Sequence, residues 1–369
     1  MEPMADASTV EQMLLNQARV RKIPANGSLE LLPLCNLNCK MCYVRLTKQE
    51  MEAQGRMRTL EEWMDIGRQM KNGGVLFLLL TGGEPLLYPD FKELFIGLKK
   101  MGMVLTINTN GTLIDEEWAD FFAEYKPRRI NITLYGTSDE TYQELCRAPH
   151  GYQKVLQAVR LLKERGVDVK LAGSATKSNE NEIEDIIKVG HSLGVPVVVD
   201  TYMMPGTRER TLPYDYQSRL NPEAAALARV KALKQEMSKE AFLEYRKMKL
   251  AQIDQFVPGE EVAEPIGCMA GNCSFTINWK GNMQPCVMLT NPSANVFEVG
   301  FEAAWNHVMS EAQKLHTSPK CSVCKWRGLC RTCVASGLLE EGDHGRVPEY
   351  MCRYAKETER LLREMKEDE

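Results

Sequence analysis

The sequence has few histidines, little net charge and no apolar run long enough to cross a membrane. Its 5 histidines show no spacing typical of a zinc site or a catalytic pair. A formal net charge of −4 over 369 residues favours neither a nucleic-acid partner nor a membrane partner. The first residues contain neither the basic segment nor the apolar segment of a signal peptide, so we expect a cytoplasmic protein.

Cysteine, by contrast, is abundant, with 12 residues. In a chain without an export signal, thiols more often bind metal than pair as disulfides. The first group, Cys35-x-x-x-Cys39-x-x-Cys42, directly follows the apolar, strand-like segment 28–34. Iron–sulfur clusters normally take four cysteines. Three thiolates on one loop can therefore bind three irons of a cubane and leave the fourth iron open.

From residue 28 to about residue 204, strand-like and helix-like segments alternate. Near-continuous apolar runs indicate strands that are buried on both faces, and amphipathic segments between them indicate helices. The expected strands are 28–34, 75–81, 103–108, 130–135, 168–175 and 196–203, and the expected helices are 59–72, 90–101, 115–125, 139–146, 151–165 and 180–193. This alternation predicts an α/β fold with six βα units on a parallel sheet, fewer than the eight that close a barrel.

The segment Cys35-Asn-Leu-Asn-Cys39-Lys-Met-Cys42-Tyr43 resembles the signature of the radical S-adenosylmethionine (radical SAM) enzymes. The resemblance implies a partial (β/α)6 TIM-like barrel whose catalytic cysteines, Cys35, Cys39 and Cys42, hold a [4Fe–4S] cluster that chelates SAM. One electron, from an external flavodoxin- or ferredoxin-type reductant, then splits SAM into methionine and a 5′-deoxyadenosyl radical that abstracts hydrogen from a substrate. Met41 departs from the usual aromatic residue, with a small expected effect.

The resemblance also implies SAM contacts at the ends of later strands. Thr81-Gly82-Gly83-Glu84-Pro85 matches the motif for the SAM amino group, because glycines let the backbone approach a ligand and Glu84 can accept from an ammonium. The implied SAM-binding residues are Tyr43, Gly82, Gly83, Glu84, Pro85, Asn110, Thr133 and Arg147. Thr133 and Tyr135 stand where relatives usually have Ser followed by Asp. Each of these residues also suits an ordinary turn or surface position.

Eight further cysteines lie near the C-terminus, where spacing alone fits zinc and iron–sulfur clusters equally well. Their order resembles the SPASM domain, the auxiliary-cluster extension of many peptide-modifying radical SAM enzymes. The resemblance assigns one [4Fe–4S] cluster to Cys268, Cys273, Cys286 and Cys333, and another to Cys321, Cys324, Cys330 and Cys352. The total would be three clusters. Two residues separate Cys330 from Cys333, where the pattern often has three.

These observations predict five consecutive parts. They are a helical extension over 1–27, the radical SAM partial barrel over 28–220, a helical linker over 221–265, a SPASM domain with two auxiliary clusters over 266–355, and a charged helical tail over 356–369. In the extension, Ser8-x-x-Glu11 fits a capping box. We expect that helix to pack against the barrel, with a substrate lid as the alternative.

The substrate implied by the resemblance is a ribosomally made peptide that is oxidised or crosslinked. Only 34 residues precede Cys35, too few for the leader-binding module of many relatives, so a separate leader-peptide-binding partner is one expectation. Conversion of Ser or Cys to formylglycine is an alternative, but those maturases carry Asp where this chain has Val287. A small-molecule substrate is another alternative, and a non-catalytic zinc or iron–sulfur protein is a remote one.

Three residues near the expected site have no assigned partner in the sequence. Asp200 and Tyr202 end the sixth expected strand, where they can handle a proton. Cys146 is outside the three cysteine groups and is expected to be a small buried hydrophobe beside Arg147.

Overall fold

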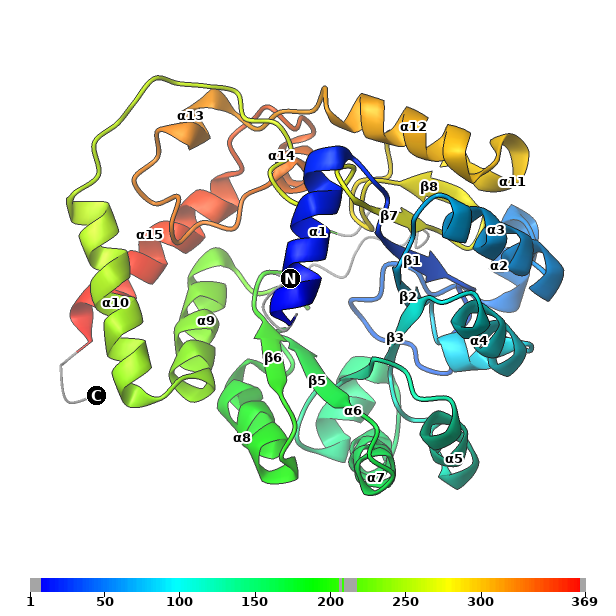
Figure 1. Ribbon diagram of the computed structural model, residues 1–369. Helices are drawn as coiled ribbons and strands as arrows, with labels where there is room; N and C mark the ends of the chain where they lie inside the picture. The colour runs from blue at the N-terminus through cyan, green and yellow to red at the C-terminus, as the bar shows by residue number, and fades with distance from the viewer. Residues whose placement is uncertain (1–7, 206–207, 209–217, 366–369) are drawn as a thin grey trace.

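A nine-stranded open sheet organises the protein, which is described by a computed structural model over residues 8–205, 208 and 218–365. The strand order is β6-β5-β4-β3-β2-β1-β7-β8-β9. The first six are β1 (Asn26–Glu30), β2 (Phe77–Thr81), β3 (Val104–Thr109), β4 (Arg129–Thr133), β5 (Val169–Ser174) and β6 (Val197–Asp200). They are all parallel. The predicted α/β partial barrel of six βα units is therefore confirmed, and Figure 1 shows helices along the outer side of the curved sheet.

Six helices of this barrel agree closely with the amphipathic pattern. They are α3 (Leu60–Asn72), α4 (Phe91–Lys100), α5 (Glu116–Glu124), α6 (Asp139–Cys146), α7 (Gly151–Glu164) and α8 (Ile183–Leu193), with short 3-10 turns at Pro85–Leu87 and Glu180–Glu182. Each buries an apolar face; in α4, for example, Phe91, Leu94, Phe95 and Leu98 are all buried. A further helix, α2 (Lys48–Gln54), was not predicted and packs through Met51 near Trp279.

The cysteine-rich region, residues 266–355, continues the same sheet. Strand β7 (Ser274–Ile277) pairs parallel with β1, and β8 (Asn282–Gln284) and β9 (Ala294–Asn295) follow antiparallel. Side chains also join the two strands, since the Ser28 hydroxyl lies 2.9 Å from that of Thr276. The sequence did not predict these strands, because an alternation over four residues or fewer is too short to distinguish from a loop.

Helix α1 (Thr9–Arg21) lies at the edge of the sheet where the parallel strands begin (Figure 1). Its Glu11 forms an ion pair with Arg128, just before β4, with an Nε–O distance of 2.6 Å, and Lys22 donates to Asn272, just before β7. The predicted capping box at Ser8 is present. The cysteine loop follows the opposite end of β1, so α1 packs against the barrel and the substrate-lid alternative is wrong.

The remaining helices are α9 (Pro222–Glu236), α10 (Lys239–Asp254), α11 (Val296–Val299), α12 (Phe301–Ala312), α13 (Pro319–Ser322), α14 (Val334–Glu341) and α15 (Glu349–Glu364). The structure differs from the expected solvated tail over 356–369, because that segment belongs to α15, which begins at Glu349 and packs against α9, and Thr358 and Leu362 within it are buried. The first seven residues of the expected extension and the last four of the expected tail lie outside the described residues. No helix in the described part of the chain is long and apolar enough to cross a membrane.

Candidate active site

The cysteine loop, residues 35–43, follows an extended segment after β1 and is held by the end of α6. The amide of Asn38 donates to the carbonyl of Cys146 at 3.0 Å, and the amide of Lys40 donates to Leu145 at 2.9 Å. Cys39 is buried, whereas Cys35 and Cys42 are partly exposed. Cys39 is thus the most enclosed residue of the three.

Gly82 and Gly83 allow a second loop to lie directly against the stem of the cysteine loop. The Gly83 amide donates to the Leu32 carbonyl at 2.7 Å, and the Glu84 amide donates to the Leu34 carbonyl at 2.9 Å. A Cβ on Gly82 would lie 2.6 Å from the Leu32 oxygen, and one on Gly83 would lie 2.3 Å from the Leu34 oxygen. Backbone contacts this close exclude any side chain, so both positions require glycine.

The carboxylate of Glu84 is turned inward and is completely buried. It accepts hydrogen bonds from the Thr109 hydroxyl and the Asn110 amide, both at 2.8 Å, and from the Leu86 amide at 3.1 Å. Burial raises the pKa of Glu84 to about 7, against the lowering effect of these donors. In this structure the Glu84 side chain therefore joins the ends of β2 and β3. The part of the Gly82–Glu84 motif that remains for a ligand is its backbone. Pro85 is buried and starts the next 3-10 turn.

The other residues expected to contact SAM surround the cysteine loop in different ways. Asn110 donates through Nδ2 to the Cys35 sulfur at 3.7 Å and to the Asn36 side chain at 2.9 Å. Thr133 is the partly buried last residue of β4. Arg147 is exposed and caps α6 in the left-handed conformation, with a φ of 56°. Asn110 thus contacts the thiol of Cys35, whereas the Arg147 side chain lies at the surface.

Two side chains at the buried thiol were not assigned a role from the sequence. Cys146 is fully buried, and its thiol shares a hydrogen bond with Cys39, which together with burial raises the pKa of Cys39 well above its usual range. The hydroxyl of Tyr135 bonds the same sulfur. Burial and the charges of Cys39 and Cys146 raise the pKa of Tyr135 as well. The sequence signals for Tyr135 were its place just after a strand end and its match to the position where relatives usually have Asp.

The eight cysteines near the C-terminus fall into two groups by their mutual electrostatic effects. Burial and then the charges of Cys333 and Cys268 raise the pKa of Cys286 to about 11, and burial and Cys268 raise that of Cys273. The pKa of Cys330 is raised to about 12, mainly by burial and further by the charges of Cys352, Cys321 and Cys324. The members of these groups are Cys268, Cys273, Cys286 and Cys333, and then Cys321, Cys324, Cys330 and Cys352.

Within the described ranges, no three His, Cys, Asp or Glu side chains converge tightly enough to hold a single metal ion. The thiolates of a cubane bind different irons and do not converge on one point, so this finding does not test a cluster. Thiol donors in sets of three and four, all buried or partly buried except the exposed Cys268, do have the chemistry that iron–sulfur clusters require.

Tyr43 connects the cysteine loop with the first of the two C-terminal groups. Burial and the charge of Glu30 raise its pKa, and Cys42 and Cys286 add to this effect. Its ring lies 5.3 Å from the guanidinium of Arg208. Arg208 also donates to the carbonyl of Val287 at 3.5 Å. The residues that follow Cys42 and Cys286 therefore meet at one place in the mouth of the barrel.

The end of β6 is attached to the cysteine-rich region by two polar contacts. Asp200 accepts from Arg331, which lies between Cys330 and Cys333, at 2.8 Å. The Tyr202 hydroxyl donates to Glu340 at 3.0 Å, and burial and Glu340 raise the pKa of Tyr202. Both side chains are thus engaged between the barrel and the cysteine-rich region, an arrangement that favours a structural role over proton handling.

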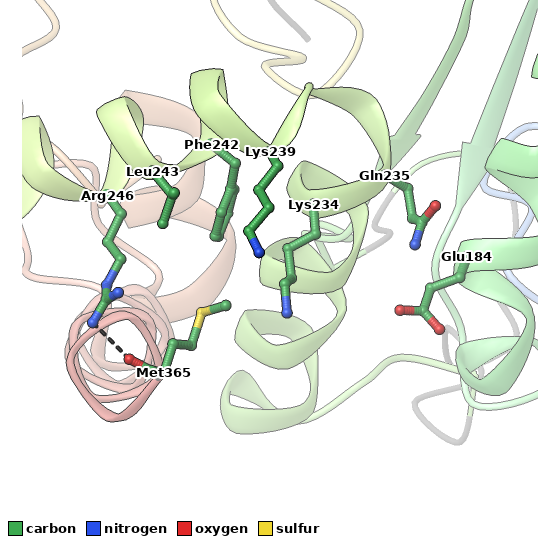
Figure 2. Close-up of a pocket in the computed structure, with 8 residues that line it drawn as sticks. All are labelled: Glu184, Lys234, Gln235, Lys239, Phe242, Leu243, Arg246 and Met365. Atoms are coloured by element: carbon green, nitrogen blue, oxygen red, sulfur yellow. Dashed lines mark hydrogen bonds between the residues drawn. The ribbon is translucent and has the colours of Figure 1, made fainter. Parts of the chain in front are cut away.

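A cavity of about 280 Å³ lies elsewhere, between the ends of α8, α9, α10 and α15 (Figure 2). Its lining includes Lys234 and Lys239, which point into the same space, and Arg246, which caps α15 through the Leu362 and Met365 carbonyls. None of the predicted site residues lines it.

Comparison with known proteins identifies one domain. Residues 29–190 match the radical SAM superfamily. The chain contains a radical SAM domain. That superfamily uses SAM and one [4Fe–4S] cluster, and the chain is an enzyme, so the non-catalytic alternative is set aside.

Similar proteins extend beyond this domain into the cysteine-rich region. The antilisterial bacteriocin subtilosin biosynthesis protein AlbA of Bacillus subtilis is 24% identical over 90% of this chain and 72% of its own. The AdoMet-dependent heme synthase of Oleidesulfovibrio alaskensis is also 24% identical, over 88% of this chain and 86% of its own. Streptococcus suis SuiB, solved with its precursor peptide SuiA, has a TM-score of 0.65 at 18% identity, with 94% and 82% coverage. The protein anSMEcpe with bound AdoMet has a TM-score of 0.64 at 21% identity, with 92% and 97% coverage. These two structures share the fold.

Proposed function

We propose that this radical SAM enzyme oxidises or crosslinks a ribosomally made peptide and uses two auxiliary [4Fe–4S] clusters in its cysteine-rich region. The observation that carries this proposal is the separation of eight thiols into two groups of four, the first of which meets the cysteine loop at Tyr43. A second electron acceptor beside the radical site suits a net two-electron oxidation, because the substrate radical must lose a further electron.

In this proposal, Cys35, Cys39 and Cys42 hold the SAM-binding cluster. When bound, the cluster and SAM supply the one-electron cleavage that yields a 5′-deoxyadenosyl radical. The backbone at Gly82 and Gly83, with the buried Glu84 as its support, binds the SAM amino group. The remaining proposed SAM-binding residues are Tyr43, Pro85, Asn110, Thr133 and Arg147.

The auxiliary ligands in this proposal are the two groups of thiols described above. Tyr43 and Arg208 support a short path between the first of them and the cysteine loop, since Tyr43 is influenced by both Cys42 and Cys286. A flavodoxin- or ferredoxin-type protein is the proposed reductant.

The names of several relatives support a peptide substrate. AlbA takes part in bacteriocin biosynthesis, and the B. subtilis protein SkfB, 25% identical over 45% of this chain, is a sporulation killing factor maturation protein. Formylglycine formation is less well supported, because Val287 offers no carboxylate at the position that those maturases use. The proposed peptide is recognised directly or through a separate leader-binding protein.

A small tetrapyrrole is the second candidate substrate. It is favoured by relatives of comparable coverage that are heme synthases, and by a pre-heme d1 synthase of Dinoroseobacter shibae that is 34% identical over 44% of this chain. Binding of a porphyrin precursor to the reconstituted enzyme, seen as a shift of its absorbance, would favour this candidate over a peptide.

The test is anaerobic reconstitution with iron and sulfide, followed by dithionite and SAM, and an assay for 5′-deoxyadenosine. We expect 5′-deoxyadenosine and about twelve irons per chain, and coupled product with a short peptide encoded beside this protein. Cys42→Ala should retain the auxiliary clusters, about eight irons, and produce no 5′-deoxyadenosine. Equal 5′-deoxyadenosine output from that variant would contradict the assigned cluster, and about four irons in the native enzyme would contradict the auxiliary clusters.

A further inference from the structure

Cys146, outside the three cysteine groups, lies directly opposite Cys39. It is the last residue of α6, and its side chain is fully buried. Two backbone hydrogen bonds, from Asn38 to Cys146 and from Lys40 to Leu145, bracket Cys39 against the end of this helix. The register of these bonds brings the two side chains together, and their thiols share a hydrogen bond.

Tyr135 approaches the same sulfur from the strand β4 side. Its ring packs edge-on against Tyr142, with centroids 5.9 Å apart and an interplanar angle of 79°. Its amide donates to the Tyr142 hydroxyl at 3.2 Å, so both its backbone and its ring are fixed. These contacts fix the position of the Tyr135 hydroxyl at the Cys39 sulfur.

The three loop thiols are bonded by different kinds of donor. Cys35 accepts from the Leu37 amide at 3.4 Å and from the Asn110 side chain at 3.7 Å, and Cys42 accepts from the Arg45 amide at 3.3 Å. At Cys39 two of the partners are side chains, Cys146 and Tyr135, beside the residue's own backbone amide. Once Cys39 is a thiolate bound to iron it has no proton, so Cys146 and Tyr135 must be the donors.

We propose that Cys146 and Tyr135 are positioning residues that donate hydrogen bonds to the Cys39 sulfur and raise the reduction potential of the SAM-binding cluster. The inference rests on the proposed function, since it requires that cluster at Cys39. Hydrogen bonds to cluster sulfurs stabilise the reduced form, which carries one more negative charge, and they do so most where solvent is excluded. Cys39 is the most enclosed of the three thiols, so donors there have the largest effect.

The test is a potentiometric titration of the reconstituted full chain, followed by electron paramagnetic resonance with and without SAM. SAM alters the signal of the cluster with an open iron alone, so the SAM-sensitive signal reports this cluster. In Cys146→Ala we expect the ratio of reduced to oxidised cluster at fixed potential to fall about tenfold, which is a shift of about 59 mV for a one-electron couple. Cys146→Ser keeps a donor and should remain near the native midpoint.

Tyr135→Phe removes the second donor and should shift the midpoint in the same direction. Its matched control is Tyr152→Phe, because Tyr152 neighbours Tyr142, with ring centroids 6.4 Å apart, and does not reach the loop thiols. Native midpoints in Cys146→Ala and Tyr135→Phe, with full iron content, would overturn the inference. Should Cys146→Ala fail to assemble the cluster, an unshifted Tyr135→Phe alone would overturn it. If the native chain has no SAM-sensitive signal, both the inference and the proposed cluster assignment are wrong.

Discussion

The guanidinium of Arg208 donates two hydrogen bonds of 2.6 Å to the carboxylate of Glu30. The two side chains are only 2% and 3% exposed. Glu30 is the last residue of β1, and Arg208 also contacts Tyr43 and Val287. The attraction within a buried ion pair often only offsets the free energy lost when both charges leave water, so such a pair adds little net stability. The pair instead joins the residue after the cysteine loop's last thiol, Tyr43, to the residue after Cys286, Val287.

Arg208→Met should be strongly destabilising because it leaves the Glu30 carboxylate buried without its cation. We expect a loss of about 3–5 kcal/mol in the free energy of unfolding. The double variant Glu30→Gln/Arg208→Met removes both charges and should recover much of that loss. Urea unfolding of the three reconstituted proteins measures the difference, and equal losses in the single and double variants would contradict a pairing between these two residues.

Gly83→Ala should disturb the cysteine loop, because the new Cβ would meet the Leu34 carbonyl at 2.3 Å. We expect a loss of about 1–3 kcal/mol from overpacking, together with lower iron content. Gly259→Ala is the matched control, since a Cβ there meets nothing within 4 Å. The measurements are thermal unfolding and iron per chain; native values for Gly83→Ala would show that the stem can move aside.

Cys321→Ala should separate SAM cleavage from product formation. Cys321 is influenced by Cys352 and Cys324 and belongs to the second group of thiols. We therefore expect 5′-deoxyadenosine to remain measurable while product from the peptide is lost. Quantifying both compounds in one reaction provides the check, and normal product would show that this group has no part in electron transfer.

Glu84 should give the protein a specific pH dependence of stability. Its pKa is raised from an ordinary 4.5 to about 7, so the folded protein holds a proton that the unfolded chain releases. This stabilisation is complete below about pH 4.5 and is lost as the pH rises through about 7. Between pH 6 and pH 8 the free energy of unfolding should fall by about 1.3 kcal/mol from this group. Urea unfolding at both pH values should show a smaller fall in Glu84→Gln; an identical fall would place the titration elsewhere.

The barrel was predictable because its elements carry long patterns. The expected strand 103–108 appears as Val104–Thr109, and the expected helix 139–146 appears with those bounds. The expected strand 28–34 ends early, at Glu30, because residues 31–34 leave the ladder to pair with the Gly82–Glu84 turn. The local sequence pattern does not show that residues 31–34 pair with this turn instead of continuing the strand.

The site was predictable to the extent that its chemistry lies in contiguous motifs. The partners of Cys39 were not, because the contact with Cys146 depends on the register between α6 and a loop a hundred residues earlier. Glu84 was assigned by its residue type to an ammonium, while its actual donors come from the end of β3, which the motif does not contain.

The pairing of β1 with β7 has a consequence for synthesis of the chain. At the usual rate of translation, the roughly 245 residues between these strands take on the order of 10–50 s to emerge. During that interval one side of β1 has no hydrogen-bonding neighbour, and exposed strand edges attract other chains. The nascent protein is therefore vulnerable to aggregation until the segment just after Cys273 arrives, and truncation before that point would make the vulnerability permanent.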